Sequence, residues 1–590
     1  LPSHTSIMTG TYPMAHGARD NSTFIVPDRV TTLAEILGNA GYETAAIVAS
    51  FVLDSRFNLD QGFASYNDDV GAYWSIDEVR VREANEFGFS ERKANLVTAA
   101  ALDWLELPRR EPFFLWLHYF EPHEPINPPE PHQSRFTEAY DAEVAFADEQ
   151  LGRFLDALRR RGELDSTIVI ITADHGEGLT DHDEPTHSLL IFDSTMHVPL
   201  IIRPPGGRPA MRVAPVASIV DIVPTVLDML DIEIPAETQG RSLVPVMGGG
   251  ADWPDRFVYM ESLVARLQCG WSELRGLRSG TEKLIHGPKP RYYRVDEDPL
   301  EIYDLAPRQS QRVVELTSEL DRAIQGWRTA EAEAAATPLD ETALAQLQAL
   351  GYLAGPATVP SGLDGPLAAA SRLDDPHDLQ RLFNLFSIAL EDLRQGAYLI
   401  GIRRLETVLA ADPDNPAVLT YLGKAYLLMA RQPVQARAAF ERALAADPRQ
   451  YEANVFMARL LLAEGDKTAA EQHARAALGV MPDSVEALYE LARVERALGQ
   501  DQRAGATLRL ALDRDSKHLP SLLGLATLHA VRKEHEAAKL YFDRALAIAP
   551  NNAEVLYNVA IWHLQDQDTG AAIHRLEQAL RAAPQHGEAH

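Results

Sequence analysis

The sequence contains one cysteine, Cys269, among its 590 residues. A single cysteine excludes an internal disulfide and a cysteine-based zinc site, and it leaves the redox compartment undetermined. No apolar run approaches the ~20 residues that a membrane-spanning helix needs, and no signal-peptide pattern opens the chain. These two absences carry little weight, because the chain starts at Leu1 without an initiator methionine and we expect that start to lie inside a domain.

Basic residues are also scarce. The chain has 55 Lys and Arg against 85 Asp and Glu, which gives a formal net charge of −30. A nucleic-acid partner is therefore not expected, because phosphate binding needs a basic face. The same charge repels an anionic substrate, so a site for one requires a metal or a local cluster of Arg and Lys.

The chain is too long for one hydrophobic core, and its pattern changes along its length. Up to about residue 354, β-branched and aromatic runs alternate with amphipathic helical stretches. Strands are expected within 42–50, 112–120, 166–174 and 197–205, and helices within 31–41 and 140–162. This alternation predicts an α/β domain over residues 1–354, with a sheet sandwiched by helices.

A linker and a second domain follow. Residues 355–376 are rich in Gly, Pro, Ser and Ala, which is typical of a linker. From residue 377 to 590 the pattern is helical, and Pro413, Pro448, Pro482, Pro550 and Pro584 recur at intervals of 35, 34, twice 34 and 34. A period of 34 is that of tetratricopeptide repeats, so we predict about six repeats in an all-α superhelix.

Small residues recur at three positions of these repeats, where they allow two helices to approach closely. The three sets are Gly423, Ala458, Ala492, Ala526, Ala560; Ala436, Ala470, Ala504, Ala538, Ala572; and Ala443, Ala477, Ala511, Ala545, Ala579. Large residues such as Phe440 and Phe542 are expected to fill the gaps. The concave groove of such a superhelix suits a protein or peptide partner.

The motif with the clearest chemistry is Ser166 to Gly178, STIVIITADHGEG. Val169 to Ile171 predict a fully buried strand of a parallel sheet, so Asp174 and His175 should emerge at its carboxyl end. Active sites of open α/β sheets lie at such ends. A carboxylate beside an imidazole offers two metal ligands, and the alternative is a charged turn after a strand.

The N-terminal part resembles the sulfatase and alkaline-phosphatase superfamily over residues 1 to about 354. The similar blocks occur in order: LPSHTSIMTGTYPMAHG, TTLAEILGNAGYETAAIVAS, HYFEPHEPINPPEP, TADHGEG, HSLLIFDSTMHVPLIIRPPG, VDIVPTVLDML, QGRSL and LQALGYLA. The resemblance implies an alkaline-phosphatase-like fold and a metal-dependent hydrolase of sulfate or phosphate esters. In that family a nucleophile attacks the ester and the covalent intermediate is then hydrolysed.

The resemblance also places the nucleophile outside the sequence. In the family it lies two residues before the proline of a Cys/Ser/Thr-x-Pro-Ser-Arg motif, and that proline is Pro2 here. The nucleophile is therefore expected just before Leu1, and the family's first pair of metal-binding aspartates further upstream. We expect the full-length protein to be an ester hydrolase and the sequence from Leu1 alone to be inactive.

Other site residues are assigned by the same resemblance. Asp174 and His175 match the family's second pair of metal ligands. His187 matches either a further metal ligand or a substrate-binding position, and His123 matches a substrate-contacting histidine; an ordinary loop histidine is the alternative for both. His4 occupies the arginine position of the nucleophile motif and is assigned to substrate binding.

The metal and the substrate stay open at this stage. His4 in place of arginine weakens the case for a formylglycine sulfatase. The ion is Ca²⁺ if the protein is sulfatase-like, and Zn²⁺ or Mn²⁺ if it is phosphatase-like, which His175 with His187 would suit. For His182 we expect a loop position, and for Lys283 a solvated surface position is an equal alternative to a family role.

Two hypotheses follow. The protein is either a metal-dependent hydrolase of anionic esters whose repeats recruit a partner, or an interaction scaffold whose α/β domain has lost catalysis. The resemblance alone favours a bacterial protein of the periplasm or cell envelope.

Overall fold

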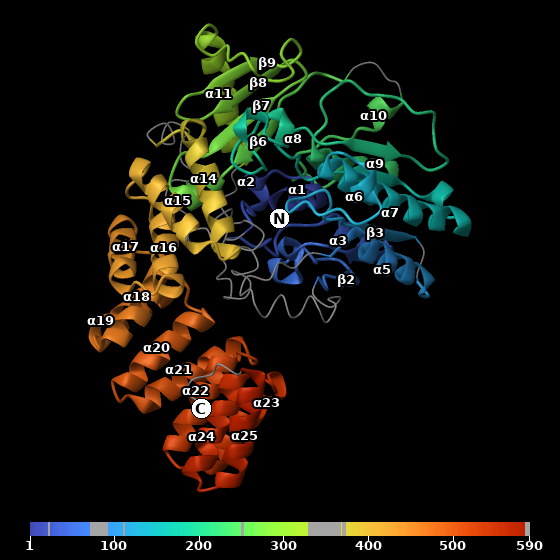
Figure 1. Cartoon of the computed structure of the whole chain (residues 1–590). Helices are drawn as coiled ribbons and strands as arrows, with labels where there is room; N and C mark the ends of the chain where they lie inside the picture. The colour runs from blue at the N-terminus through green and yellow to red at the C-terminus, as the bar shows by residue number, and fades with distance from the viewer. Residues whose placement is uncertain are drawn as a thin grey trace. The chain divides into compact units, whose positions relative to one another are not determined.

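The computed structural model describes residues 1–21, 24–70, 92–109, 112–248, 253–327, 367 and 373–583. These residues form two compact units, which meet along the chain between Gly396 and Ala397 (Figure 1). Most of the predicted linker at 355–376, the LQALGYLA block and Pro584 lie outside the described residues. Within the described ranges, no helix combines the length and the apolarity that crossing a bilayer requires.

The described residues of the N-terminal unit form three small sheets. In the first, β1 (Glu43–Ile47) lies between β2 (Ser65–Asn67) and β3 (Phe113–Leu117), with both pairs parallel. In the second, β4 (Val169–Thr172) pairs with β5 (Leu200–Arg203). The third is an antiparallel sheet of β6 (Val258–Ser262), β7 (Leu274–Arg278), β8 (Glu282–His286) and β9 (Arg291–Arg294).

Helices surround these sheets, as the α/β prediction requires. They are α1 (Pro2–Thr9), α2 (Pro13–His16), α3 (Leu33–Asn39), α5 (Ala94–Glu106), α6 (His132–Arg135), α7 (Ala139–Arg161), α8 (Asp193–Met196), α9 (Ile222–Met229), α10 (Val244–Met247), α11 (Ser310–Trp327) and α14 (Pro376–Arg394). The expected strands are confirmed at β1, β3, β4 and β5, and the expected helices at α3 and α7. Leu33 and Leu37 of α3 share one apolar cluster with Val223 and Leu227 of α9.

The prediction of a fully buried parallel strand at β4 is wrong in two respects. β4 is half-buried, and its ladder partner is the antiparallel β5, with Ile170 opposite Ile202. The physical reason is the connection between them, because residues 173–199 fold back and return the chain antiparallel without a crossover to a parallel neighbour. Along its other edge, β4 has no ladder partner among the described residues.

The second unit consists of consecutive helices. They are α15 (Tyr398–Ala411), α16 (Pro416–Lys424), α17 (Pro433–Ala446), α18 (Tyr451–Glu464), α19 (Lys467–Val480), α20 (Val485–Ala497), α21 (Asp501–Arg514), α22 (Leu519–Val531), α23 (His535–Ile548), α24 (Ala553–Gln565) and α25 (Thr569–Ala582). The three predicted sets of small residues are all buried. A Cβ added at Gly423 would lie 2.4 Å from the Phe440 ring, so the predicted pairing of small with large residues is present.

Helix α14 belongs to the N-terminal unit, although the sequence boundary at residue 376 assigned it to the repeats. Its apolar residues Leu379, Leu382 and Phe383 pack against a cluster that contains Ile191 and Phe192. Burial of this face against the α/β domain places the boundary between the compact units after α14 rather than before it.

The segment between β4 and β5 is held in a folded-back loop by its own backbone. The amide of Gly176 donates to the carbonyl of Thr195 at 2.7 Å, and the amide of Gly178 donates to Thr186 at 2.6 Å. The carboxylate of Glu184 closes the turn by accepting the amides of Leu189 and Leu190. Burial raises the pKa of Glu184 to about 7 against the opposing effect of these two amides.

This raised pKa predicts a pH-dependent stability. The pKa of Glu184 is near 4.5 in the unfolded chain, so the folded protein binds this proton more tightly. The free energy of unfolding therefore falls as pH rises from 4.5 to about 7, and the whole loss of stability is present above pH 7. Glu184→Gln keeps an acceptor oxygen and removes the charge. Its unfolding free energy relative to the parent should therefore rise by about 3 kcal/mol from pH 4.5 to pH 8.

Urea unfolding of both proteins at the two pH values measures this difference. Glu237→Gln, at an exposed position, controls for the loss of one negative charge. If the difference in unfolding free energy between Glu184→Gln and the parent were the same at both pH values, the raised pKa of Glu184 would be contradicted.

Candidate functional site

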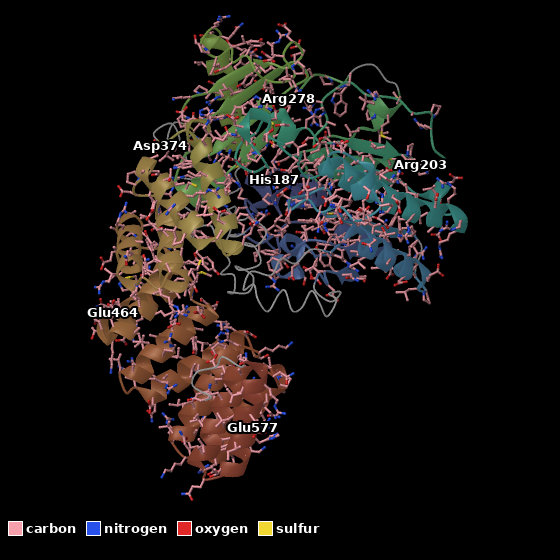
Figure 2. All side chains as sticks on the ribbon, in the orientation of Figure 1. His187, Arg203, Arg278, Asp374, Glu464 and Glu577 are labelled. Atoms are coloured by element: carbon pink, nitrogen blue, oxygen red, sulfur yellow. The ribbon has the colours of Figure 1, made fainter. Side chains whose placement is uncertain are left out.

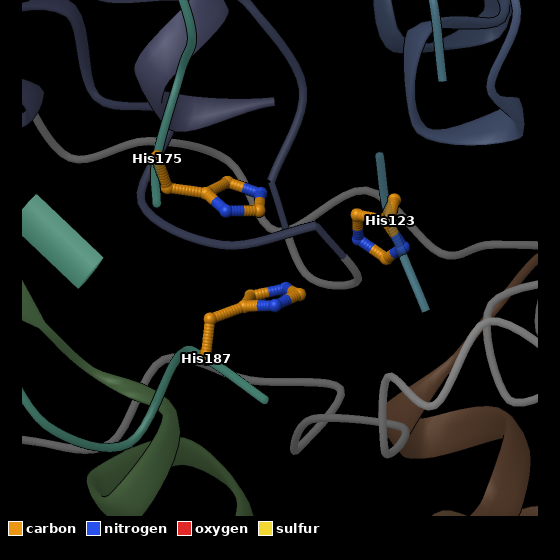
Figure 3. A group of neighbouring side chains, drawn as sticks. All are labelled: His123, His175 and His187. Carbon is orange, nitrogen blue, oxygen red and sulfur yellow. The ribbon is translucent and has the colours of Figure 1, made fainter. Parts of the chain in front are cut away.

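Three separate segments bring histidines together at the ends of β3 and β4. His123 follows β3, His175 follows β4, and His187 lies in the loop between β4 and β5. Figure 3 shows the three rings in one space, each carried by its own stretch of backbone. Their closest ligand atoms all lie within 4.8 Å of one another.

The rings contact one another closely. Those of His175 and His187 stack with centroids 4.1 Å apart, and the His123 ring lies 4.9 Å from His187 and 5.8 Å from His175. The predicted pairing of His175 with His187 is therefore present in the geometry. His123 joins the same cluster, a position that sequence spacing alone did not predict.

A fixed hydrogen-bond partner orients each ring. The Nδ1 atoms lie 2.6 Å from the Glu124 carbonyl for His123, 2.8 Å from the Gly176 carbonyl for His175, and 3.3 Å from Glu177 Oε1 for His187. A carbonyl oxygen or an ionised carboxylate oxygen can only accept, so each Nδ1 carries the hydrogen and donates it. In the neutral form of each ring, Nε2 is then left with a lone pair, which is the form that ligates a metal.

The charge state agrees with this arrangement. Burial lowers the pKa of His123 to about 3 and lowers the pKa of His187 well below its ordinary value. Both imidazoles are therefore neutral at neutral pH. The donor set fits an ion that prefers imidazole nitrogen, such as Zn²⁺, better than Ca²⁺, which prefers oxygen.

Asp174 lies on the other side of His175, beside His4. Its Oδ2 atom is 3.4 Å from His4 Nδ1 and 3.5 Å from His175 Nε2. Burial alone would raise the pKa of Asp174, but His175, His4 and His118 hold this pKa well below its usual range. An ionised carboxylate therefore adjoins the histidine cluster, and the buried His4 faces that carboxylate.

Two residues of the site were not singled out from the sequence. The ring of His118 lies 4.9 Å from that of His4, and its Nδ1 accepts the amide of Ala49 at 3.3 Å. Glu177 orients His187 and is itself almost fully buried. His118 occurs in the block HYFEPHEP and Glu177 in the block TADHGEG. These blocks also contain the predicted site residues His123, Asp174 and His175, so closeness in sequence could have identified both.

The other two residues considered from the sequence, His182 and Lys283, make packing and ion-pair contacts. His182 stacks on Phe192 at 3.6 Å and lies in the loop, as expected. The surface interpretation of Lys283 is wrong, because its side chain is fully buried and its Nζ lies 2.7 Å from both Asp193 and Glu301. Arg278, labelled with His187 in Figure 2, adds a second cation 3.1 Å from Asp193. This ion-pair cluster fixes the segment that follows His187.

A cavity of about 1040 Å³ opens beside these groups. Its lining includes Leu1, Pro2, Asp174, His175 and His187. The first residues of the chain and the predicted metal ligands therefore share one cavity.

Comparison with known families agrees with this reading of the two units. The family model described as Sulfatase matches residues 1–232, and the one described as N-sulphoglucosamine sulphohydrolase, C-terminal, matches residues 187–326. Two models described as Tetratricopeptide repeat match residues 427–474 and 457–518.

Individual proteins show similar but partial matches. Arylsulfatase K of Bos taurus is 42% identical over 106 residues, covering 18% of this chain and 19% of that protein. The uncharacterized sulfatase YidJ of Escherichia coli K12 is 26% identical over 308 residues, covering 42% of this chain and 61% of that protein. The chain thus spans about a fifth to three fifths of the length of these two curated relatives.

Among solved structures, the phosphonate monoester hydrolase of Agrobacterium radiobacter is similar with a TM-score of 0.45 and 21% identity, covering 56% of this chain and 86% of that one.

The predicted order of an α/β domain and an all-α repeat domain is confirmed by the helices and strands described above and by the family matches. The N-terminal part of the chain is a sulfatase-family domain, and tetratricopeptide repeats follow it.

Proposed function

We propose that the full-length protein is a metal-dependent hydrolase of sulfate or phosphate esters, and that a protein or peptide partner binds its repeats. The observation that carries this proposal is the cluster of His123, His175 and His187 beside the ionised Asp174. Three imidazoles grouped beside a carboxylate are the donor set of a divalent metal centre.

The proposed ligands are Nε2 atoms of the three histidines, because each Nδ1 is already engaged with an acceptor oxygen. The carboxylate of Asp174 completes the predicted pair with His175 and offsets part of the ion's charge. A bound Zn²⁺ or Mn²⁺ would neutralise charge on the nonbridging oxygens of the ester. In this proposal His123 changes from the predicted substrate contact to a metal ligand.

The charge balance of the chain supports a metal in this place. A net charge of −30 repels an anionic ester, and a divalent ion in the pocket reverses the local field. The nucleophile is proposed to precede Leu1, and the position of Leu1 in the same cavity as Asp174 and His175 supports that assignment. His4, adjoining Asp174, keeps its proposed role in binding substrate.

The first test uses a chain extended upstream of Leu1 to include the predicted nucleophile. We expect it to hydrolyse an aryl sulfate, a phosphate monoester or a phosphate diester, and a chelator should abolish that turnover. Asp174→Ala should lower kcat/KM by more than about 100-fold, because loss of an outer partner of a ligand already costs 10–100-fold. Asp156→Ala, on the exposed face of α7, is the matched control.

Turnover that survives both the chelator and Asp174→Ala would refute the metal-dependent mechanism. An extended chain that hydrolyses none of the three substrates would favour the scaffold hypothesis instead.

Metal binding is tested separately from turnover on the chain from Leu1. Titration with Co²⁺, followed by its visible absorption, should show one bound ion. His187→Ala should abolish the spectrum, and Glu177→Gln should weaken Co²⁺ binding about 10- to 100-fold because it removes the carboxylate that orients His187. His535→Ala in the exposed part of the repeats is the control. Unchanged Co²⁺ affinity in His187→Ala would remove His187 from the ligand set.

A further inference from the structure

The loop that carries His187 has an unusual backbone. Leu179, Thr180, His182 and Asp183 have φ values of 48°, 74°, 50° and 59°, in the left-handed region that side chains disfavour. A segment with four such residues does not hold its own conformation by local preference. Hydrogen bonds within the loop and contacts from neighbouring elements must therefore hold it in place.

Helix α14 supplies that support at the tip of the loop. The side-chain amide of Gln380 donates from Nε2 to the carbonyl of His182 at 2.6 Å. The side-chain amide of Asn384 donates from Nδ2 to the carbonyl of Asp183 at 2.7 Å. Gln380 and Asn384 are four residues apart, so they lie on one face of the helix and reach two consecutive carbonyls.

The helix is itself fixed to the α/β domain. Asp375 caps its first turn by accepting the amide of His377, and the same carboxylate accepts the amide of Lys289. The ring of His377 contacts Phe192 edge-on, and the ring of His182 stacks on that same Phe192. α14 and the loop thus share one buried aromatic contact. The helix lies beside the sheet of β6 to β9 (Figure 1).

A displacement at the tip would reach the site through few residues. His187 follows Asp183 by four positions. The turn at the tip is closed by a hydrogen bond that the Thr180 amide donates to the Glu184 carbonyl. A hydrogen bond from the Gly178 amide to the Thr186 carbonyl fixes the base of the loop next to His187. The stacking of His187 on His175 therefore depends on the position of residues 182 and 183.

We propose that Gln380 and Asn384 are positioning residues that hold the 178–187 loop so that His187 remains with His123 and His175. The role of His187 as a ligand rests on the proposed function, whereas the effect on the loop does not. Along the chain α14 continues through residues 395–397 into α15, so the element that holds the site loop is also the one that joins the hydrolase domain to its repeats.

The test replaces the two amides in the full chain with apolar side chains of similar size, Gln380→Met and Asn384→Leu, singly and together. Gln395→Met, at an exposed position just after α14, makes the same chemical change away from the loop. Hydrogen–deuterium exchange is measured for residues 178–187, for α14 and for β4. The affinity for Co²⁺ is measured on the same samples.

We expect the double variant to exchange at least tenfold faster in residues 178–187, with α14 and β4 unchanged, and to bind Co²⁺ at least tenfold more weakly. The Gln395→Met variant should match the parent in both measurements. Because Gln380 is buried, Asn384→Leu alone serves as the variant least able to disturb the fold.

Parent-like loop exchange in every variant would overturn the proposal, as would faster exchange spread equally over α14 and β4 in Asn384→Leu. A parent chain that binds no Co²⁺ would instead refute the proposed metal centre. In that case, hydrogen–deuterium exchange in residues 178–187 would by itself test whether Gln380 and Asn384 hold the loop.

Discussion

The site depends on a close backbone approach at Gly176 and Gly178. A Cβ at Gly176 would lie 2.3 Å from the carbonyl oxygen of Ser194, and a Cβ at Gly178 would lie 2.3 Å from that of Glu184. No side chain fits at either contact without moving backbone. The two glycines therefore allow residues 178–195 to fold back on the end of β4, which places the His187 ring 4.1 Å from that of His175. The Asp-His-Gly-Glu-Gly motif thus combines two of the proposed ligands, Asp174 and His175, with the two glycines that allow the chain to fold back.

Some parts of this arrangement could be predicted from the sequence because local chemistry determines them. The apolar run before Asp174 ends abruptly, which predicts a strand end, and the 34-residue period predicts which small residues are buried between helices. The convergence of His123 with His175 and His187 was not predictable from spacing, because three different connections bring the rings together. Lys283 was ambiguous in the same way, since the two carboxylates that stabilise it when buried lie 90 and 18 positions away.

Pairing and boundaries were the least predictable features. The composition of β4 predicted burial, but the folded-back loop decided that its partner is the antiparallel β5. The helical pattern of α14 matched the helices after it, and an amphipathic pattern does not reveal which core its apolar face joins. In the structure that face meets Ile191 and Phe192, so the helix forms part of the N-terminal α/β domain. The amides of Gln380 and Asn384 then connect it to the loop next to the site.

In the proposed metal centre, three histidines hold one divalent ion through Nε2, while each Nδ1 keeps its hydrogen and donates it to its acceptor oxygen. ¹⁵N NMR of the histidine-labelled chain, assigned with single-histidine variants, reports both nitrogens directly. On addition of one equivalent of Zn²⁺, we expect the Nε2 signals of His123, His175 and His187 to shift together while their Nδ1 atoms remain protonated. Coordination through Nδ1, or a shift confined to other histidines, would contradict it.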